Sequence, residues 1–360
     1  MEPVPTNSAV QGDLFPPPEP PWATLSDEQL LGWRISDLKV SLNSPPIQQR
    51  VERLYRELEA KHLLFRPACY LTTEWLTPDR IPHVGIPFYL AHPRLIRLEK
   101  TMMLEAEGES EEECMKLLRH ETGHAINYAY QLFRKSRWRE LFGPMTTEYD
   151  PHSYIMRPYS KQFVTHLRDN YAQAHPDEDF AETFAVWLTP NLDWRKRYAD
   201  WGALKKLEYV DHLMADLAGK PPTVTEGPRY WAASRTRSTL GSYFKAKQRE
   251  FGEGFKGFYD PALNTLFPSP PAGSPTEPAH RFLSRHRKSF VNIICEWGLI
   301  PKYSVHQLVS RLVERAKAMN LRVPTEADPT LLLRVGVSLN SLLLGEQGRY
   351  KPPAPETKPS

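Results

Sequence analysis

The chain has 360 residues, of which 40% are hydrophobic and 25% are charged, as in an ordinary globular protein that folds in water. Its formal charge of +3 is too small to indicate nucleic acid or a membrane surface as a partner, and no apolar run approaches the length of a membrane span. The N-terminus lacks the basic and apolar regions of a secretory signal, and three widely spaced cysteines do not predict a disulfide framework. We therefore expect a cytoplasmic protein.

Prolines divide the chain into folded and unfolded segments. There are 35 of them, concentrated in residues 1–24, 267–278 and 348–360. This composition predicts a disordered tail at each end and a linker between two folded parts. The larger part, residues 25–266, is long enough for its own hydrophobic core, and residues 279–347 form a smaller unit.

The first elements predicted in the larger part are a helix and two strands. Residues 45–64 ("PPIQQRVERLYRELEAKHLL") carry apolar side chains at helical spacing. Residues 68–76 ("ACYLTTEWL") and 85–99 ("GIPFYLAHPRLIRLE") are rich in aromatic and β-branched residues, which favours strands. Pro87 and Pro93 indicate that the second is an edge strand, along which an extended peptide substrate could add, although an ordinary sheet edge fits equally well.

A longer helix is predicted over residues 109–133 ("ESEEECMKLLRHETGHAINYAYQLF"). Ser110 and Glu113 have the spacing of a capping box, and acidic residues crowd the first turn. Apolar side chains then recur at helical spacing up to Leu132. The histidines of "RHETGHAINY" therefore lie in the middle of a helix.

Those histidines have the spacing of a metal site. His120 and His124 are four residues apart, so they share one face of the helix and can bind one ion. Glu121 projects beside them, where it can accept a proton from an attacking water. This is the H-E-x-x-H arrangement of zinc peptidases, and a catalytic zinc needs a third protein ligand with one position left open.

The third ligand is expected in a second helix. Pro176 suits the first turn of a helix and is followed by three acidic residues in "HPDEDFAETFAVWL". Glu178 and Glu182 are four residues apart on a largely apolar helix, where buried carboxylates need a cation or hydrogen-bond donors. One can bind zinc and the other can orient a ligating histidine, and the spacing alone does not decide between them.

"RHETGHAINY" and "YAQAHPDEDFAETFA" together resemble the zinc-binding metallopeptidases of bacteria, a gluzincin-like family whose layout recurs in the anthrax lethal factor and Pro-Pro endopeptidase group. The resemblance covers roughly residues 60–200. It implies that Glu178, the first glutamate of "EDFAE", ligates the metal and that Glu182 orients a histidine. It also implies a functional tyrosine at Tyr171, seven residues before Glu178. The chain lacks the cysteine-rich zinc ribbon that some members carry.

The implied fold is α+β: a zincin-like metallopeptidase core with a small sheet, an active-site helix and a mostly helical remainder. An all-helical unit follows, because "SVHQLVSRLVERAKAM" (304–319) has a continuous apolar stripe. This unit lies outside the resemblance and could bind a protein partner. Its basic stretch "RFLSRHRK" (281–288) favours a solvated face or an acidic partner over nucleic acid.

The predicted function is that of a zinc-dependent metallopeptidase acting on a peptide or protein, with one zinc ion bound by His120, His124 and Glu178. Glu121 is the expected general base, and Tyr171 is the expected donor to the developing oxyanion. Two alternatives stay open: a zinc amidase or hydrolase acting on a modified peptide or small molecule, and a non-catalytic binding protein stabilised by zinc. Glu121 speaks against the latter, because structural zinc needs no general base.

Overall fold

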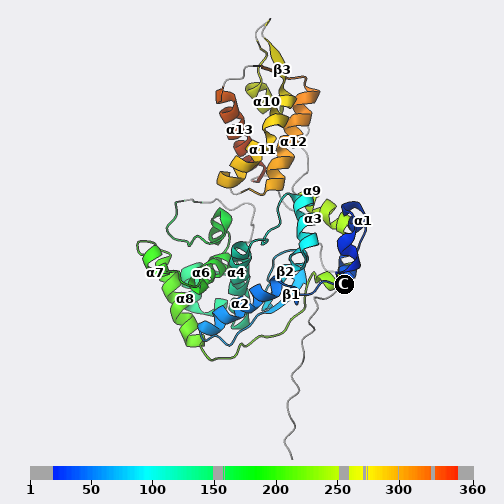
Figure 1. Ribbon diagram of the computed structural model, residues 1–360. Coiled ribbons are helices and arrows are strands. Elements are labelled where there is room, and N and C mark those ends of the chain that lie inside the picture. Colours follow the sequence, from blue (N-terminus) through cyan, green and yellow to red (C-terminus); the bar gives the residue numbers. More distant parts are fainter. Residues whose placement is uncertain are drawn as a thin grey trace, which may run out of the picture.

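The computed structural model describes most of the chain as two helical units, with the smaller one above the larger body in Figure 1. The predicted tails over residues 1–18 and 348–360 lie outside the described residues. The structure describes residues 19–148, 157, 159–250, 259–270, 273, 275–298, 300–325 and 329–347. None of the helices in these ranges combines the length and the apolar character that a membrane crossing needs.

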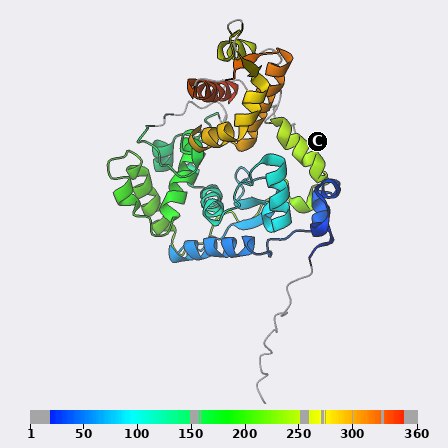
Figure 2. The same ribbon diagram turned by 45° about the horizontal axis from the view of Figure 1, so that its top comes forward.

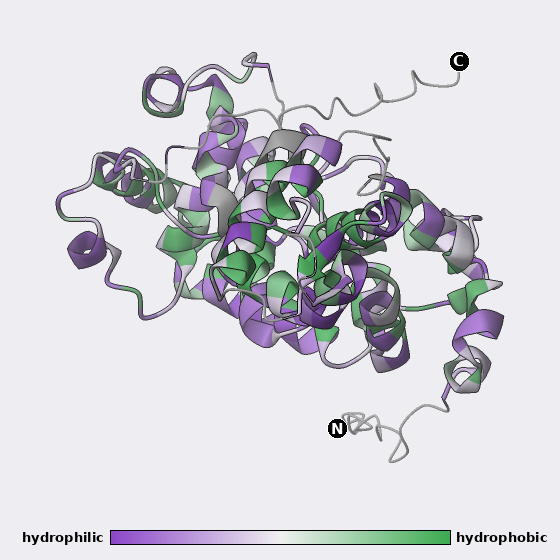
Figure 3. Ribbon diagram, turned by 90° about the horizontal axis from the view of Figure 1, so that it is seen from above, coloured by the Kyte–Doolittle hydropathy of each residue, from purple (hydrophilic) through white to green (hydrophobic). Residues whose placement is uncertain are grey.

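The body is mostly helical around one small sheet, which agrees with the predicted α+β class. Its hydrophobic cluster draws on nearly every element, and Figure 3 shows apolar segments gathered in the middle of the molecule. In chain order its helices and strands are α1 (Asp27–Leu31), α2 (Ile47–Ala60), β1 (Ala68–Thr72), β2 (His83–Pro87), α3 (Pro93–Met103), α4 (Glu111–Ala129), α5 (Ser136–Phe142), α6 (Pro176–Leu188), α7 (Trp194–Arg197), α8 (Leu204–Leu217) and α9 (Leu240–Glu250).

The body begins earlier than predicted. Trp22, which we expected in a disordered tail, is only 2% exposed and belongs to the hydrophobic cluster of the body. Its indole Nε1 donates to the carbonyl of Leu38 at 3.0 Å, so the buried ring and its hydrogen bond anchor this segment to the body. The folded part therefore includes residues before 25.

The sheet consists of β1 and β2, which pair in parallel from Ala68 opposite His83 to Thr72 opposite Pro87. Both strands were predicted, and in a sheet of two strands β2 lies at an edge as expected, although one isolated bridge covers part of its other side. The amide of Gly85 donates to the carbonyl of Leu76 at 2.8 Å on the side away from β1, and every residue of β2 is buried. At Gly85, therefore, the backbone groups that an added peptide strand would need are already paired.

The second half of the predicted strand 85–99 is wrong, because the chain turns into helix α3 at Pro93. His92 caps this helix: its Nδ1 accepts from the amide of Arg94 at 3.1 Å, and proline at the first helical position fits the required φ. The aliphatic residues Leu95 and Leu98 then lie three apart on the buried face.

The C-terminal unit is larger than predicted and is not purely helical. Residues 259–267, expected as the end of the body and the start of a linker, supply Tyr259, Leu263 and Phe267 to its hydrophobic cluster. A short antiparallel ribbon corrects the all-helical prediction. The elements are α10 (Asp260–Leu266), β3 (Thr276–Pro278), α11 (Ala279–Gly298), α12 (Lys302–Ala318), β4 (Arg322–Pro324) and α13 (Pro329–Gln347).

The unit touches the body at the start of α12. Tyr303 packs into the hydrophobic cluster of the body, and the amide of Lys302 donates to Glu105 Oε1 at 3.3 Å. Figure 2 shows this unit on the side of the body opposite α2, which is drawn in blue. A protein partner for the unit stays a prediction.

Candidate metal centre

Helix α4 carries the two histidines as predicted. Ser110 caps it by accepting from the amide of Glu113 at 3.2 Å, and three glutamates occupy its first turn, where the helix dipole favours negative charge. The helix then runs without interruption through His120 and His124, whose side chains lie in the buried interior of the body.

Helix α6 begins where Pro176 predicts and is buried along its whole length. His175 is its cap: Nδ1 accepts from the amide of Asp177 at 3.1 Å, and Nε2 donates to the carbonyl of Thr147 at 3.1 Å. Both ring nitrogens of His175 therefore have backbone partners, one at the helix start and one at Thr147, and His175 is not one of the three residues of the candidate metal site.

A glycine lets α4 and α6 approach each other closely. A Cβ added to Gly123 would stand 2.7 Å from Ala181 Cα and 2.9 Å from Ala181 O, closer than side chains can pack. The two helices therefore touch backbone to backbone beside the histidines. This contact brings carboxylates from the first two turns of α6 within hydrogen-bonding reach of imidazoles on α4.

Three acceptor atoms converge at this crossing. His120 Nε2, His124 Nε2 and Glu178 Oε2 lie 3.1 Å from one another in each pairing. Ligands at about 2.0–2.1 Å from a tetrahedral zinc are separated by about 3.3–3.4 Å, so the spacing fits that ion closely. All three side chains are buried, and together they form a candidate His–His–Glu metal site.

The protonation of the two rings supports a cation at this point. His120 Nδ1 lies 2.8 Å from Glu182 Oε1, and His124 Nδ1 lies 2.9 Å from Asp177 Oδ2. A carboxylate only accepts, so each Nδ1 carries a proton, and when the rings are neutral each Nε2 turns a lone pair toward the carboxylate of Glu178. Three buried acceptors facing one another need a positive charge between them.

The carboxylates that hold the rings are themselves fixed. The second oxygen of Glu182 accepts from the amide of Leu167 at 2.9 Å. Asp177 accepts from Asn127 Nδ2 at 2.7 Å and also from the hydroxyl of Tyr128. Such contacts limit ring rotation and keep both Nε2 atoms aimed at one point.

Asp177 is the functional candidate that sequence reasoning missed. It looked like part of a solvated acidic first turn, because "DED" is what the dipole at a helix start favours. Its only sequence signal is its place directly before Glu178 on a buried helix. The antiparallel crossing of α4 and α6 is what sets it beside His124.

The charges of the cluster shift its pKa values strongly. Burial lowers the pKa of His120, but Glu178 and Glu182 outweigh it and raise that pKa to about 10. Burial raises the pKa of Glu178, but the two histidines outweigh it and hold that pKa well below its usual range. A zinc ion must displace the histidine protons, so we expect zinc affinity to fall as the pH is lowered.

Glu121 and Tyr171 both lie beside the three acceptors. Glu121 is 7% exposed; burial raises its pKa, and the neighbouring His120 and His124 only partly offset this. Its backbone carbonyl accepts from Thr77 Oγ1 at 3.0 Å. The ring of Tyr171 lies 5.8 Å from that of His120, centroid to centroid. The structure thus brings every predicted site residue to one place.

Comparisons with known proteins agree with this chemistry over part of the chain. Searches of curated proteins and of solved structures found no match. Residues 100–202 match the sequence model of a family described as "Putative zinc-binding metallo-peptidase", and this segment holds α4, α6 and all three converging side chains. Residues 100–202 are therefore similar to a family of zinc-binding metallopeptidases.

Proposed function

We propose that the protein is a zinc-dependent peptidase with one zinc ion per chain, held by His120, His124 and Glu178. The observation that carries the proposal is the convergence of three buried acceptors, with both imidazole Nδ1 protons committed elsewhere. The family match over the same segment supports it. The zincin-like character of the core belongs to this proposal as well.

When bound, zinc polarises the scissile carbonyl and lowers the pKa of water to about 7. Glu121, directly after His120 on α4, then takes the proton of the attacking water and passes it to the leaving amine. Glu182 and Asp177 keep the two imidazoles in the tautomer that leaves Nε2 free of a proton. Tyr171, beside His120, donates to the oxyanion as its charge develops.

The first test is the metal content of the purified protein. We expect one zinc per chain in the wild type and nearly none in His124→Ala, because two remaining ligands bind zinc weakly. His212→Ala is the matched control, since His212 is exposed on α8 and should leave the zinc content unchanged. Equal zinc in all three proteins, measured by elemental analysis, would remove His124 from the site.

The role of Tyr171 has a separate test. We expect Tyr171→Phe to keep its zinc and to lose on the order of 10²–10³ in kcat, as for the loss of one oxyanion donor. KM should change much less, because the donated hydrogen bond strengthens only in the transition state. An unchanged kcat would assign Tyr171 to packing against His120.

The same residues would serve a zinc amidase acting on a modified peptide or small molecule. Hydrolysis of an unmodified peptide library by the wild type distinguishes the two, with the library incubated alongside the metal-free protein as the control. Cleavage that requires bound zinc supports the peptidase. Turnover confined to modified amides would replace it with the amidase.

A further inference from the structure

A cavity of about 590 Å³ lies beside α4 and α6, the two helices that carry the candidate metal centre. It is bounded by the first half of α4, the end of α6, α2 and α7, and by Thr165 and His166. None of His120, His124 and Glu178 is among the residues that line it, so this cavity is separate from the metal site. Its volume lies within the range of pockets that hold small molecules or short peptide segments.

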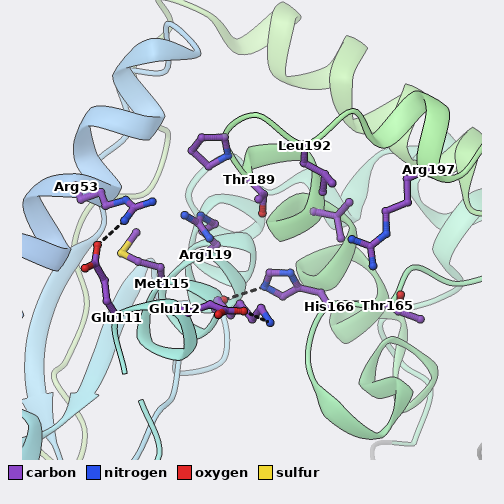
Figure 4. A pocket seen from close by; sticks show the side chains of 13 residues that line it. Arg53, Glu111, Glu112, Met115, Arg119, Thr165, His166, Thr189, Leu192 and Arg197 are labelled. Atoms are coloured by element: carbon purple, nitrogen blue, oxygen red, sulfur yellow. Dashed lines mark hydrogen bonds and ion pairs between the residues drawn. The ribbon is translucent and has the colours of Figure 1, made fainter. Parts of the chain in front are cut away.

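Cationic side chains line this cavity, and Figure 4 shows Arg197 reaching in from one side with Arg53 and Arg119 on the other. Arg119 is bound through two nitrogens to Glu57, at 2.8 Å each, and Arg53 bonds both Glu57 and Glu111.

Lys116, another cation of the lining, pairs with Glu112 at 3.0 Å. Arg197 is an exposed residue and differs from the other three: its guanidinium lies 5.6 Å from the ring centre of Tyr198, and, unlike the other three, it forms no ion pair with a carboxylate of the described residues. The cavity therefore presents one uncompensated positive charge.

The remaining wall is apolar in part, beside the polar residues Thr165, His166 and Thr189. Of the four apolar side chains that line this part, Figure 4 labels two; the four are Met115, Val186, Pro190 and Leu192. A guanidinium fork binds a carboxylate through two parallel hydrogen bonds, and an aliphatic wall favours an apolar group beside it. We propose that the cavity binds a carboxylate carried next to an apolar side chain, with Arg197 as its cationic partner.

The cavity also has a direct connection to the candidate metal site. His166 Nε2 donates to the carbonyl of Lys116 at 3.0 Å, and the next residue, Leu167, donates its amide to Glu182 at 2.9 Å. Glu182 in turn holds His120 Nδ1 at 2.8 Å. A ligand that contacts His166 therefore acts, through Leu167 and Glu182, on the orientation of His120. Binding in the cavity and binding of the metal should then be linked. This link rests on the proposed zinc site, whereas binding in the cavity does not.

Methionine-methyl NMR tests the cavity directly, because Met115 lines it. The probes are acetyl-alanyl-leucine with a free carboxylate and the same dipeptide as its C-terminal amide. We expect only the free acid to shift the Met115 signal, which is assigned with Met115→Leu. Acetyl-leucyl-aspartyl amide shows whether a side-chain carboxylate serves as well as a terminal one, and binding of either acid supports the proposal.

Arg197→Gln should weaken binding of the free acid at least about tenfold, the loss expected when a charge-assisted hydrogen bond is removed. Lys196→Gln is the matched control: it removes the same charge from the neighbouring exposed residue of α7, which does not line the cavity, and should bind as the wild type does. Equal binding by wild type and Arg197→Gln, equal shifts with acid and amide, or no Met115 shift at millimolar probe would each overturn the proposal.

A second measurement addresses the link to the metal. The zinc affinity, measured by competition with a chelator, should change at least about fivefold between probe-free and probe-saturated protein, as for a modest coupling between sites. The amide dipeptide at the same concentration is the control. An unchanged zinc affinity together with a Met115 shift would leave the carboxylate site standing and overturn its connection to Glu182.

Discussion

A Glu121→Gln variant is expected to bind zinc as the wild type does and to lose hydrolysis by about 10²–10⁴ in kcat, the usual contribution of a positioned general base. Glutamine has the shape of glutamate but cannot accept a proton from water at neutral pH. The side chain is buried beside the two histidines without being one of the three converging ligands, so the metal should remain.

The measurements are zinc content and the initial rate of peptide cleavage at saturating substrate. Glu140→Gln is the matched control, because Glu140 is exposed on α5 and its change should leave both quantities as they are. Full activity in Glu121→Gln with zinc bound would show that another group activates the water. Loss of zinc as well would show that Glu121 supports the metal.

The loss of a carboxylate from α6 should lower the zinc affinity more, the closer that carboxylate lies to the candidate metal site. We expect Glu178→Ala to be purified nearly free of zinc, because its Oε2 is one of three converging ligand atoms. Glu182→Ala and Asp177→Ala should retain zinc at roughly 10- to 100-fold lower affinity, because each loses only the carboxylate that orients one imidazole.

Competition with a chelator of known affinity measures all three variants. Thermal unfolding of each variant with and without zinc controls for damage to α6, since metal that binds the folded state raises the melting temperature. If Glu182→Ala loses its zinc while Glu178→Ala keeps it, the assignment is one helical turn out of place.

The sequence alone was enough to predict the two helices that build the site. Local signals determine them: Ser110 caps α4, Pro176 begins α6, and spacing by four places His120 and His124 on one face. These signals act over one or two turns of helix, so they do not depend on the remainder of the fold. The same holds for α12, whose apolar stripe is buried as its periodicity predicts.

The sequence predictions were wrong where the conformation of a segment depends on contacts with distant parts of the chain. Residues 85–99 combine β-rich composition with prolines, and only the pairing of β2 with β1, which ends at Pro87, and the cap at His92 show where the strand ends and α3 begins. The prolines around 267–278 predicted a linker, yet Phe267 is buried in the C-terminal cluster. Composition indicates which conformations a segment favours, and packing against distant residues decides which one it adopts.

The three candidate ligands were predicted from the sequence and from its resemblance to a family, but the contacts that support them were decided by the tertiary structure. Gly123 admits Ala181 at backbone distance, and α6 runs antiparallel to α4 at this crossing. In that arrangement Asp177 meets His124 and Glu182 meets His120. No spacing along the chain encodes such pairs, because hydrogen bonds between two helices depend on how the helices cross and not on the order of residues within either one.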